Sequence, residues 1–190
     1  MIGHSTLSLD AFVAVLHANG IQQMADIRSI PRSSRNPQFD RDSLPVSLAE
    51  AGIGYAHLAR LGGRRGRRKD LPAGASPNSG WQIESFRNYA DYALTLPFQE
   101  GIAELVEWGA RPTAAMCAEA VWWRCHRRIV ADYLLARGWT VLHIVPPAPP
   151  APHKLTAFAE IQPDGTIFYP AREDIATMNE PAALAGRSGQ

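Results

Sequence analysis

Apolar residues follow two different spacings along the first 145 residues of the chain. Short apolar runs, typical of buried strands, occur at residues 1–2, 24–27, 53–58, 113–116 and 140–145. Between these runs, apolar residues recur every three or four positions and predict helices over about 9–18, 43–51, 86–94, 98–106 and 123–136. Strands that alternate with helices of this length favour right-handed crossover connections. We therefore expect a three-layer α/β fold in which a mainly parallel sheet has helices on both faces.

The same pattern divides the chain into a core and a C-terminal part. Residues 1–145 form the α/β core, and Pro146 to Pro152 form a stiff, proline-rich linker. Apolar runs on either side of Pro163, Asp164 and Gly165 predict a C-terminal β-hairpin. This hairpin belongs to an appendage over residues 153–178 that packs on the core. We expect residues 179–190 to be a disordered tail.

Composition narrows the class of protein. No apolar stretch approaches the ~20 residues that are needed to span a bilayer, so we expect no membrane partner. The chain has only two cysteines, and its first residues do not resemble an export signal. A reducing, cytoplasmic location is therefore the expectation.

The nearly balanced total charge of +1 hides a basic region. Between Arg28 and Lys69, ten basic residues stand against three acidic ones, which favours an anionic partner. Part of this excess falls in a long, glycine-rich loop from residue 59 to about residue 82, and loops of that length are typical of functional lids. A solvated loop without a ligand is the simpler alternative. The candidate lid or nucleic-acid contacts in this loop are Arg64, Arg65, Arg67 and Arg68.

Polar segments follow four of the predicted strands at their carboxyl ends, where parallel sheets bind their ligands. They are Gly3-His4-Ser5, the segment from Asp26 to Arg32, Gly62-Gly63 with the arginines after them, and the segment from Cys117 to Arg127. The loops at the opposite edge, such as Asn19-Gly20, carry almost no ionisable side chains. This polarity predicts one site at the carboxyl edge of the sheet.

The segment from Met116 to Arg128 has the densest chemistry, because it holds both cysteines, a carboxylate, an imidazole and three guanidiniums. It connects a predicted strand to a predicted helix, and a helix N-terminus attracts anions. We expect an anion to bind to Arg28, Arg32, Arg127, His4 and Ser5.

Candidate catalytic residues lie in the same segment. Glu119 or His126 could transfer a proton, although an ion pair with an arginine is an equal alternative for Glu119. Cys125 shares the positive helix end that lowers the pKa of a thiol, but cysteines are also common as small core residues. Cys117 follows an apolar strand and is predicted to be structural. Trp122 and Trp123 are unusual in a turn, and one could stack on a base while the other fills the core; Trp122 is the candidate nucleic-acid contact.

The sequence fits three established types of motif poorly: those of cysteine phosphatases, of zinc sites and of nucleotide-binding loops. Arg124 lies seven positions after Cys117, whereas the cysteine phosphatase signature requires six. A zinc site could draw on Cys117, Cys125, His126 and His4, but the sequence lacks a closely spaced cysteine pair and so assigns no metal. Neither a Walker loop nor a GxGxxG motif is present, and no cofactor is assigned.

Several motifs in one order resemble a known family. They are Gly3-His4-Ser5, the run from Asp26 to Ser33, Leu61-Gly62-Gly63, the run from Phe86 to Tyr92, Cys117-Ala118-Glu119 and Cys125-His126-Arg127. From residue 2 to about residue 145, the chain is similar to the family called domain of unknown function 488 (DUF488). The resemblance implies a three-layer α/β fold and supports the positions of Cys117, Glu119, Cys125, His126, Arg127 and Arg28 as a site. It implies no activity, although DNA-repair labels on some members are compatible with nucleic acid.

Three functional hypotheses follow from these observations. The first is an enzyme that acts on a phosphate-bearing substrate, a nucleotide or nucleic acid, at the carboxyl edge of the sheet. The second is a binding module in which the same arginines grip nucleic acid or a nucleotide without catalysis. The third is a thiol redox or metal-binding protein that uses Cys117 and Cys125. The sequence does not set the oligomeric state.

Overall fold

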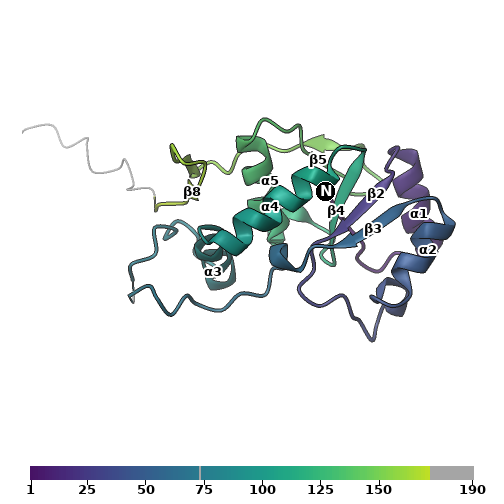
Figure 1. Ribbon diagram of the computed structural model, residues 1–190, viewed down its shortest axis with the longest axis horizontal. Helices are drawn as coiled ribbons and strands as arrows, with labels where there is room; N and C mark the ends of the chain where they lie inside the picture. Colours follow the sequence, from purple (N-terminus) through teal and green to yellow (C-terminus); the bar gives the residue numbers. More distant parts are fainter. Residues whose placement is uncertain (73, 172–190) are drawn as a thin grey trace, which may run out of the picture.

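The computed structural model describes residues 1–72 and 74–171 (Figure 1). Its centre is a four-stranded parallel sheet in the order β1-β4-β2-β3. The strands are β1 (Ile2–Gly3), β2 (Gln23–Asp26), β3 (Gly54–His57) and β4 (Thr113–Cys117). The helices are α1 (Leu9–Ala18), α2 (Leu44–Glu50), α3 (Glu84–Ala93), α4 (Leu96–Trp108) and α5 (Arg127–Ala136). The predicted α/β class is confirmed.

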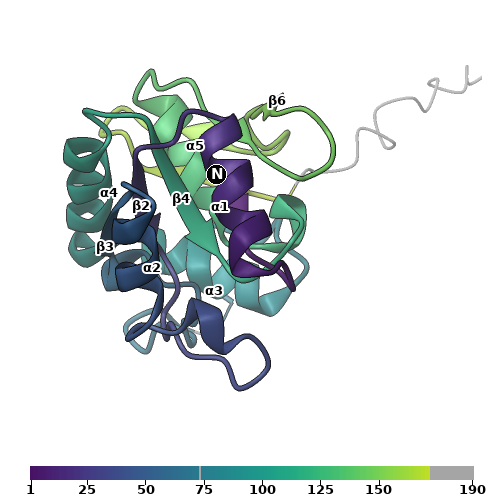
Figure 2. The same ribbon diagram turned by 90° about the vertical axis from the view of Figure 1, so that its right-hand side faces the viewer.

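Alternation along the strands divides the core into two layers. Met24 and Ala114 face one layer with side chains of α1 and α2, whereas Ala25 and Ala115 face the other with side chains of α3, α4 and α5. The helices α1 and α2 accordingly lie to the right of the sheet in Figure 1 and in front of it in Figure 2. This arrangement confirms the helices on both faces of the sheet. Ser8 caps α1 as expected, because its Oγ accepts a hydrogen bond from the Ala11 amide.

The segment before α5 differs from the prediction. The apolar spacing predicts a helix from about residue 123, but Trp122–Arg124 form a separate 3-10 turn and α5 begins at Arg127. His126 is therefore the cap residue of α5 rather than a residue of its first turn. Two further 3-10 turns, Pro37–Phe39 and Ala59–Leu61, follow β2 and β3 along the chain.

The predicted strand at residues 140–145 contributes little to the parallel sheet. Within it, β5 (Leu142–His143) pairs antiparallel with β6 (Ala151–Pro152), so the proline-rich segment turns back on the core. Ile144 joins the parallel sheet through a single bridge to Ile2. Prolines have no N–H group with which to extend a ladder, which limits the strand pairing at this point.

The C-terminal hairpin is confirmed, with β7 (Glu160–Ile161) antiparallel to β8 (Ile167–Phe168). The buried side chains of Ile167 and Tyr169 join the core layer of α3, α4 and α5. The expected disordered tail at residues 179–190 lies outside the described residues.

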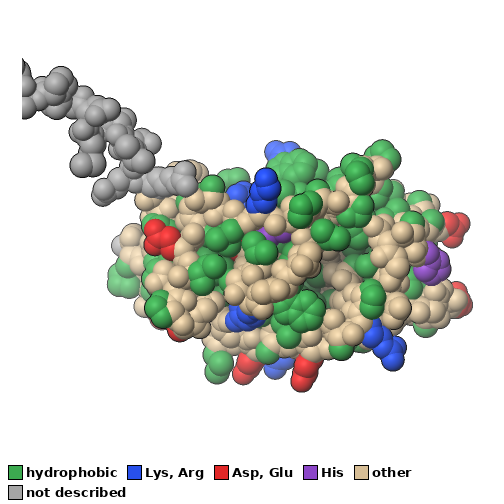
Figure 3. Space-filling view, turned by 90° about the horizontal axis from the view of Figure 1, so that it is seen from above, with side chains coloured by type: hydrophobic (Ala, Val, Ile, Leu, Met, Phe, Trp, Pro, Cys, Tyr) green, Lys and Arg blue, Asp and Glu red, His purple; other side chains and the backbone are tan. Residues whose placement is uncertain are grey.

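Two observations concern the helices and the surface of the described residues. Among the helices that the structure describes, none combines the length and the apolar character that a bilayer span requires. On the face shown in Figure 3, apolar side chains are interspersed with neutral ones, and the basic side chains stand apart from one another.

Candidate functional site

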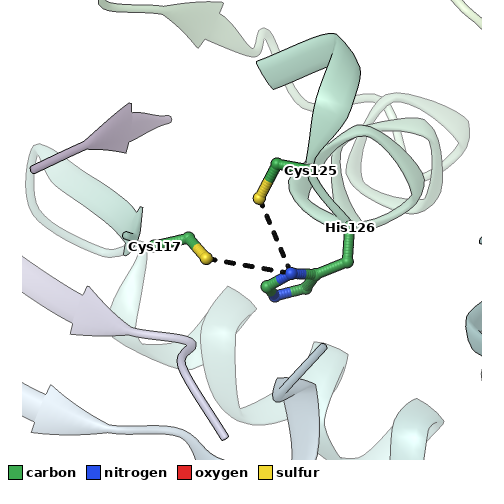
Figure 4. Close-up of side chains that lie close together, drawn as sticks. All are labelled: Cys117, Cys125 and His126. Carbon is green, nitrogen blue, oxygen red and sulfur yellow. Dashed lines mark hydrogen bonds between the residues drawn. The ribbon is translucent and has the colours of Figure 1, made fainter. Parts of the chain in front are cut away.

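Both cysteines and His126 meet where β4 ends and α5 begins. Cys117 is the last residue of β4, and Cys125 and His126 immediately precede α5. Their side chains point toward a common centre (Figure 4). The His126 Nδ1 atom lies 3.8 Å from the Cys117 Sγ atom and 3.6 Å from the Cys125 Sγ atom. We call these three residues the thiol–imidazole cluster.

The orientation of the His126 ring is fixed on several sides. Its Nε2 atom lies 3.1 Å from the Ile27 carbonyl oxygen, which can only accept, so Nε2 carries the proton. The Nδ1 atom then presents a lone pair to the two sulfurs. Tyr89 contacts the ring edge-to-face at 4.9 Å, and a Cβ atom at Gly63 would come within 2.3 Å of Nδ1. Gly63 therefore provides the space that the ring occupies.

The two thiols are buried and differ in acidity. The contact with Cys117, together with the charge and the N–H groups of Arg127, lowers the pKa of Cys125 to about 6. The same contact with Cys125, and burial, raise the pKa of Cys117. One thiol of the pair therefore ionises well before the other, and the thiolate is the form that attacks electrophiles and binds metals.

A second polar cluster, the Asp26–Arg28–His4 network, lies at the ends of β1 and β2. The Arg28 Nη2 atom forms a buried ion pair with Asp26 Oδ2 at 2.6 Å and donates to the Phe39 carbonyl at 2.7 Å. Tyr55 donates to the same carboxylate at 2.8 Å. Arg28, expected to bind an anion, thus directs its guanidinium toward acceptors within the protein.

His4 is held as a neutral imidazole within this network. Its Nδ1 donates to the Ser5 carbonyl at 2.9 Å, and its Nε2 accepts from the Arg28 Nη1 atom at 3.2 Å. The ring stacks on Phe39 at 4.2 Å. Burial, followed by the charge of Arg28, lowers the pKa of His4 to about 4. Ser5 adopts a left-handed conformation and donates its amide to the Ala118 carbonyl, so His4 and Ser5 connect β1 to the turn after β4.

The buried side chain of Arg127 stabilises the turn between β4 and α5. Its side chain is 1% exposed, and its Nη2 atom donates to the Glu119 carbonyl at 2.5 Å. Its Nε atom has no hydrogen-bond partner among the described residues. Gly3 permits this packing, because a Cβ atom there would come within 1.8 Å of the Glu119 carbonyl oxygen. The Glu119 side chain itself is exposed.

The arginines of the basic loop and of the neighbouring loops at the carboxyl edge divide into two groups. Arg65 donates to three backbone carbonyls and lies 3.8 Å over the Tyr92 ring, while Arg68 pairs with Asp70. Arg67 donates to the Leu71 carbonyl at a long 3.5 Å. The other group consists of exposed arginines at the carboxyl edge whose guanidiniums have no partner in the part of the chain that the structure describes. They include Arg32, Arg35, Arg64 and Arg124.

The two tryptophans before α5 also have different environments. Trp122 is half-buried and stacks on His143 at 4.1 Å with an interplanar angle of 8°. Trp123 is 50% exposed and contacts Trp122 edge-on. The ring available to a ligand is therefore that of Trp123, whereas the sequence analysis favoured Trp122 for this role.

Sequence reasoning from the apolar strand predicted a structural role for Cys117, although the family resemblance and the thiol hypothesis placed it in the site; the structure brings its Sγ atom to 3.8 Å from His126 Nδ1. The signal available was the position of both cysteines at the two ends of one strand-to-helix turn. It also left Arg124 out of the site, although this residue directly precedes Cys125.

A cavity of about 450 Å³ lies at the opposite edge of the sheet, beside the start of β4. Its lining includes Met1, Leu105, Thr113 and Trp139, and no cysteine, histidine or carboxylate side chain contributes to it. The chemistry-bearing residues therefore do not coincide with this cavity, and the carboxyl edge is the better candidate site.

Comparison with known proteins gives one match. The family model described as "Domain of unknown function DUF488" matches residues 8–134, which is more than half of the chain. No curated protein and no solved structure matches significantly. The extent of the family match shows that this chain belongs to the DUF488 family.

Proposed function

We propose that the protein is an enzyme that acts on a phosphate-bearing substrate, a nucleotide or a nucleic acid, at the carboxyl edge of the sheet. The observation that carries the proposal is the group of exposed, unpartnered arginines that borders the thiol–imidazole cluster. Arg64 follows Gly63, which packs on the His126 ring, and Arg124 precedes Cys125. The Arg64 amide donates to Ser29 Oγ at 2.8 Å, and this bond links the basic loop to the loop that carries Arg32.

These arginines suit phosphate because their donors are not already used. A guanidinium presents a planar fork of N–H groups that matches phosphate oxygens. The N–H groups of Arg28 and Arg127 donate to acceptors within the protein. Those of Arg32, Arg64 and Arg124 meet no acceptor among the described residues and can bind a ligand. Because the free guanidiniums come from three different loops, an extended ligand with several phosphates fits them better than a single phosphate group.

The residues for chemistry lie beside this basic surface. His126 offers a lone pair on Nδ1, and Glu119 offers an exposed carboxylate that has no side-chain partner among the described residues. Either group can transfer a proton from this position in the turn. The exposed ring of Trp123 can stack on a nucleobase, a contact worth ~1 to 3 kcal/mol where it has been measured.

The test is the binding of a fluorescent single-stranded oligonucleotide at several salt concentrations, in parallel with assays for its consumption. Replacing Arg32, Arg64 or Arg124 by alanine should weaken binding. The slope of log affinity against log salt should also become shallower by about 0.7 for each phosphate that the variant no longer neutralises. Arg111→Ala is the matched control, because Arg111 is an exposed arginine at the opposite edge of the sheet.

The outcomes separate the hypotheses. Consumption of the substrate that is lost in Glu119→Gln or His126→Asn supports the enzyme. Salt-dependent binding without consumption supports the binding module instead. Binding that Arg111→Ala weakens as much as Arg64→Ala contradicts a specific basic surface at the carboxyl edge.

A further inference from the structure

We infer that Cys117, Cys125 and His126 form a binding site for Zn²⁺ in which a fourth coordination position stays open. This inference goes beyond the proposed function, because it rests on the thiol–imidazole cluster and not on the arginines. Thiolate and imidazole are the ligand types that zinc prefers in proteins.

The spacing of the ligand atoms fits a tetrahedral zinc ion. With Zn–S bonds of about 2.3 Å and a Zn–N bond of about 2.0 Å, the sulfur–nitrogen edges of a tetrahedron measure about 3.5 Å. The observed separations between the His126 Nδ1 atom and the two Sγ atoms are 3.6 Å and 3.8 Å. All three ligand atoms lie within 4.8 Å of one another. An ion can therefore enter with only small shifts of the side chains.

The groups around the ligands also favour a metal site. A histidine that binds a metal usually donates its other ring N–H to a carbonyl or carboxylate, and His126 Nε2 faces the Ile27 carbonyl oxygen at 3.1 Å. Gly63 and Tyr89 hold the imidazole in place.

The donor set indicates an open site. Structural zinc sites have four protein ligands, whereas catalytic ones commonly have three and leave a position for water or substrate. Among the described residues, the group of metal ligands has three members. His4, the fourth ligand that the sequence could offer, uses Nδ1 on the Ser5 carbonyl and Nε2 on Arg28.

When Nδ1 of His126 is a zinc ligand it cannot accept a proton, so proton transfer at the open position is assigned to Glu119 alone. Glu119 follows Cys117 by two residues, and its carboxylate is exposed and unpaired among the described side chains. Two cysteines and one histidine also hold the zinc in zinc-dependent nucleobase deaminases, where a glutamate that does not bind the metal moves protons to and from a zinc-bound water. The water that this site would activate is therefore the expected nucleophile.

The alternative is a redox pair in which the two sulfurs form a disulfide. The first experiment distinguishes the two by measuring the metal content of the full-length protein, purified with a reductant and without chelator, followed by Zn²⁺ titration of the metal-free protein. We expect one equivalent of zinc. X-ray absorption at the zinc edge should show two sulfur ligands and one imidazole, and Co²⁺ substitution should give thiolate charge-transfer bands together with tetrahedral d–d bands.

Variants then assign the ligands. Cys117→Ser, Cys125→Ser and His126→Asn should each lower the Zn²⁺ affinity by more than about 100-fold, because even outer-shell changes cost 10- to 100-fold. His57→Asn is the matched control, since His57 lies at the same edge but bonds to the Arg28 carbonyl. Glu119→Gln should retain the metal. Both controls are expected to keep one equivalent of zinc.

Two results would overturn the inference. One is a wild-type protein that takes up no stoichiometric zinc and forms a Cys117–Cys125 disulfide in a redox buffer. The other is bound zinc whose absorption spectrum lacks sulfur ligands, and this result is decisive even if a cysteine variant fails to fold. Oligonucleotide binding by wild type and Arg64→Ala is measured separately, so failure of the zinc site and failure of the proposed phosphate substrate can be told apart.

Discussion

Two histidines at the same edge of the sheet occupy opposite chemical situations. His4 donates through Nδ1 to the Ser5 carbonyl and accepts through Nε2 from Arg28, so both of its ring nitrogens are used. His126 donates through Nε2 to the Ile27 carbonyl, but its Nδ1 lone pair faces two thiols. A thiol is only a weak hydrogen-bond donor, so this lone pair remains available.

This difference shows that residues from the same set of motifs have two roles: some support the structure, and others are available to bind a ligand. In the Asp26–Arg28–His4 network, strong donors meet strong acceptors, and the group has little capacity left for a ligand. In the thiol–imidazole cluster, the two thiols and the Nδ1 lone pair of His126 face one another, while the hydrogen bond that holds the ring uses Nε2. The network is therefore expected to control stability, and the cluster to control metal binding and activity.

The largest effect is expected from disrupting the Asp26–Arg28–His4 network. Asp26→Asn leaves the buried Arg28 guanidinium without its counter-charge, and breaking a buried ion pair in this way costs about 3 to 5 kcal/mol. Urea unfolding of wild type and variant measures the loss. The Zn²⁺ affinity of the folded variant should remain that of wild type.

A loss below about 1 kcal/mol in Asp26→Asn would be typical of a substitution outside any network, and it would contradict the structural role given to this group. A large fall in zinc affinity at full stability would instead assign Asp26 to the site. The two measurements together therefore decide where the network belongs.

The second prediction disturbs the cluster alone. In Gly63→Ala the new Cβ atom would lie 2.3 Å from His126 Nδ1, so the ring must move. Overpacking of this kind costs about 1 to 3 kcal/mol, and displacement of a ligand ring should weaken zinc binding at least 10-fold. Calorimetric Zn²⁺ titration and urea unfolding measure the two effects.

Gly66→Ala is the control for this experiment. Gly66 lies in the same loop, and a Cβ atom there meets nothing within 4 Å. It should leave zinc affinity unchanged. Equal zinc affinity in Gly63→Ala and wild type would mean that the metal binds to a different position of the His126 ring.

The sequence predicted the fold better than the site. The spacing of apolar residues indicates which positions are buried, but it does not indicate which distant residues come into contact. Met24 and Ala25 face the two different core layers, and a short apolar run of this kind is the expected pattern of a strand that is buried on both faces. The stacking of Trp122 on His143 joins residues far apart in the chain, and no local pattern encodes it. Trp122 and Trp123 extended the helical spacing upstream of α5, although a 3-10 turn accommodates them.

The same limitation applied to the arginines and to Cys117. Arg28 and Arg64 both follow strands at the carboxyl edge, and only the distances show that the first is paired with Asp26 and the second is free among the described residues. Cys117 ends an apolar strand, which favoured a structural role, but the path of the turn brings Cys125 and His126 back to it. The order of the motifs predicted where the site lies. Only the hydrogen bonds in the structure show which of its side chains are already paired within the protein and which remain available to a ligand.

The third and smallest prediction sharpens the comparison through pH. The pKa of His4 is about 4 in the folded protein, lowered from 6.5 by burial and then by Arg28. Between these values the unfolded chain binds a proton at His4 that the folded protein does not, so the contribution of His4 to stability falls as the pH drops from about 6.5 toward about 4. The limiting slope for this one group is about 1.4 kcal/mol per pH unit.

This slope has a structural cause that can be tested directly. A proton on His4 Nε2 would face the Arg28 N–H group that now donates to it, so the paired network resists protonation. Urea unfolding of His4→Gln over the same pH range should show a smaller slope of unfolding free energy against pH, by an amount equivalent to at most one bound proton. The exposed His17→Gln is the control for loss of a histidine. An unchanged slope in His4→Gln would mean that His4 takes up its proton without opposition from Arg28, and the contrast between the two histidines would then rest on His126 alone.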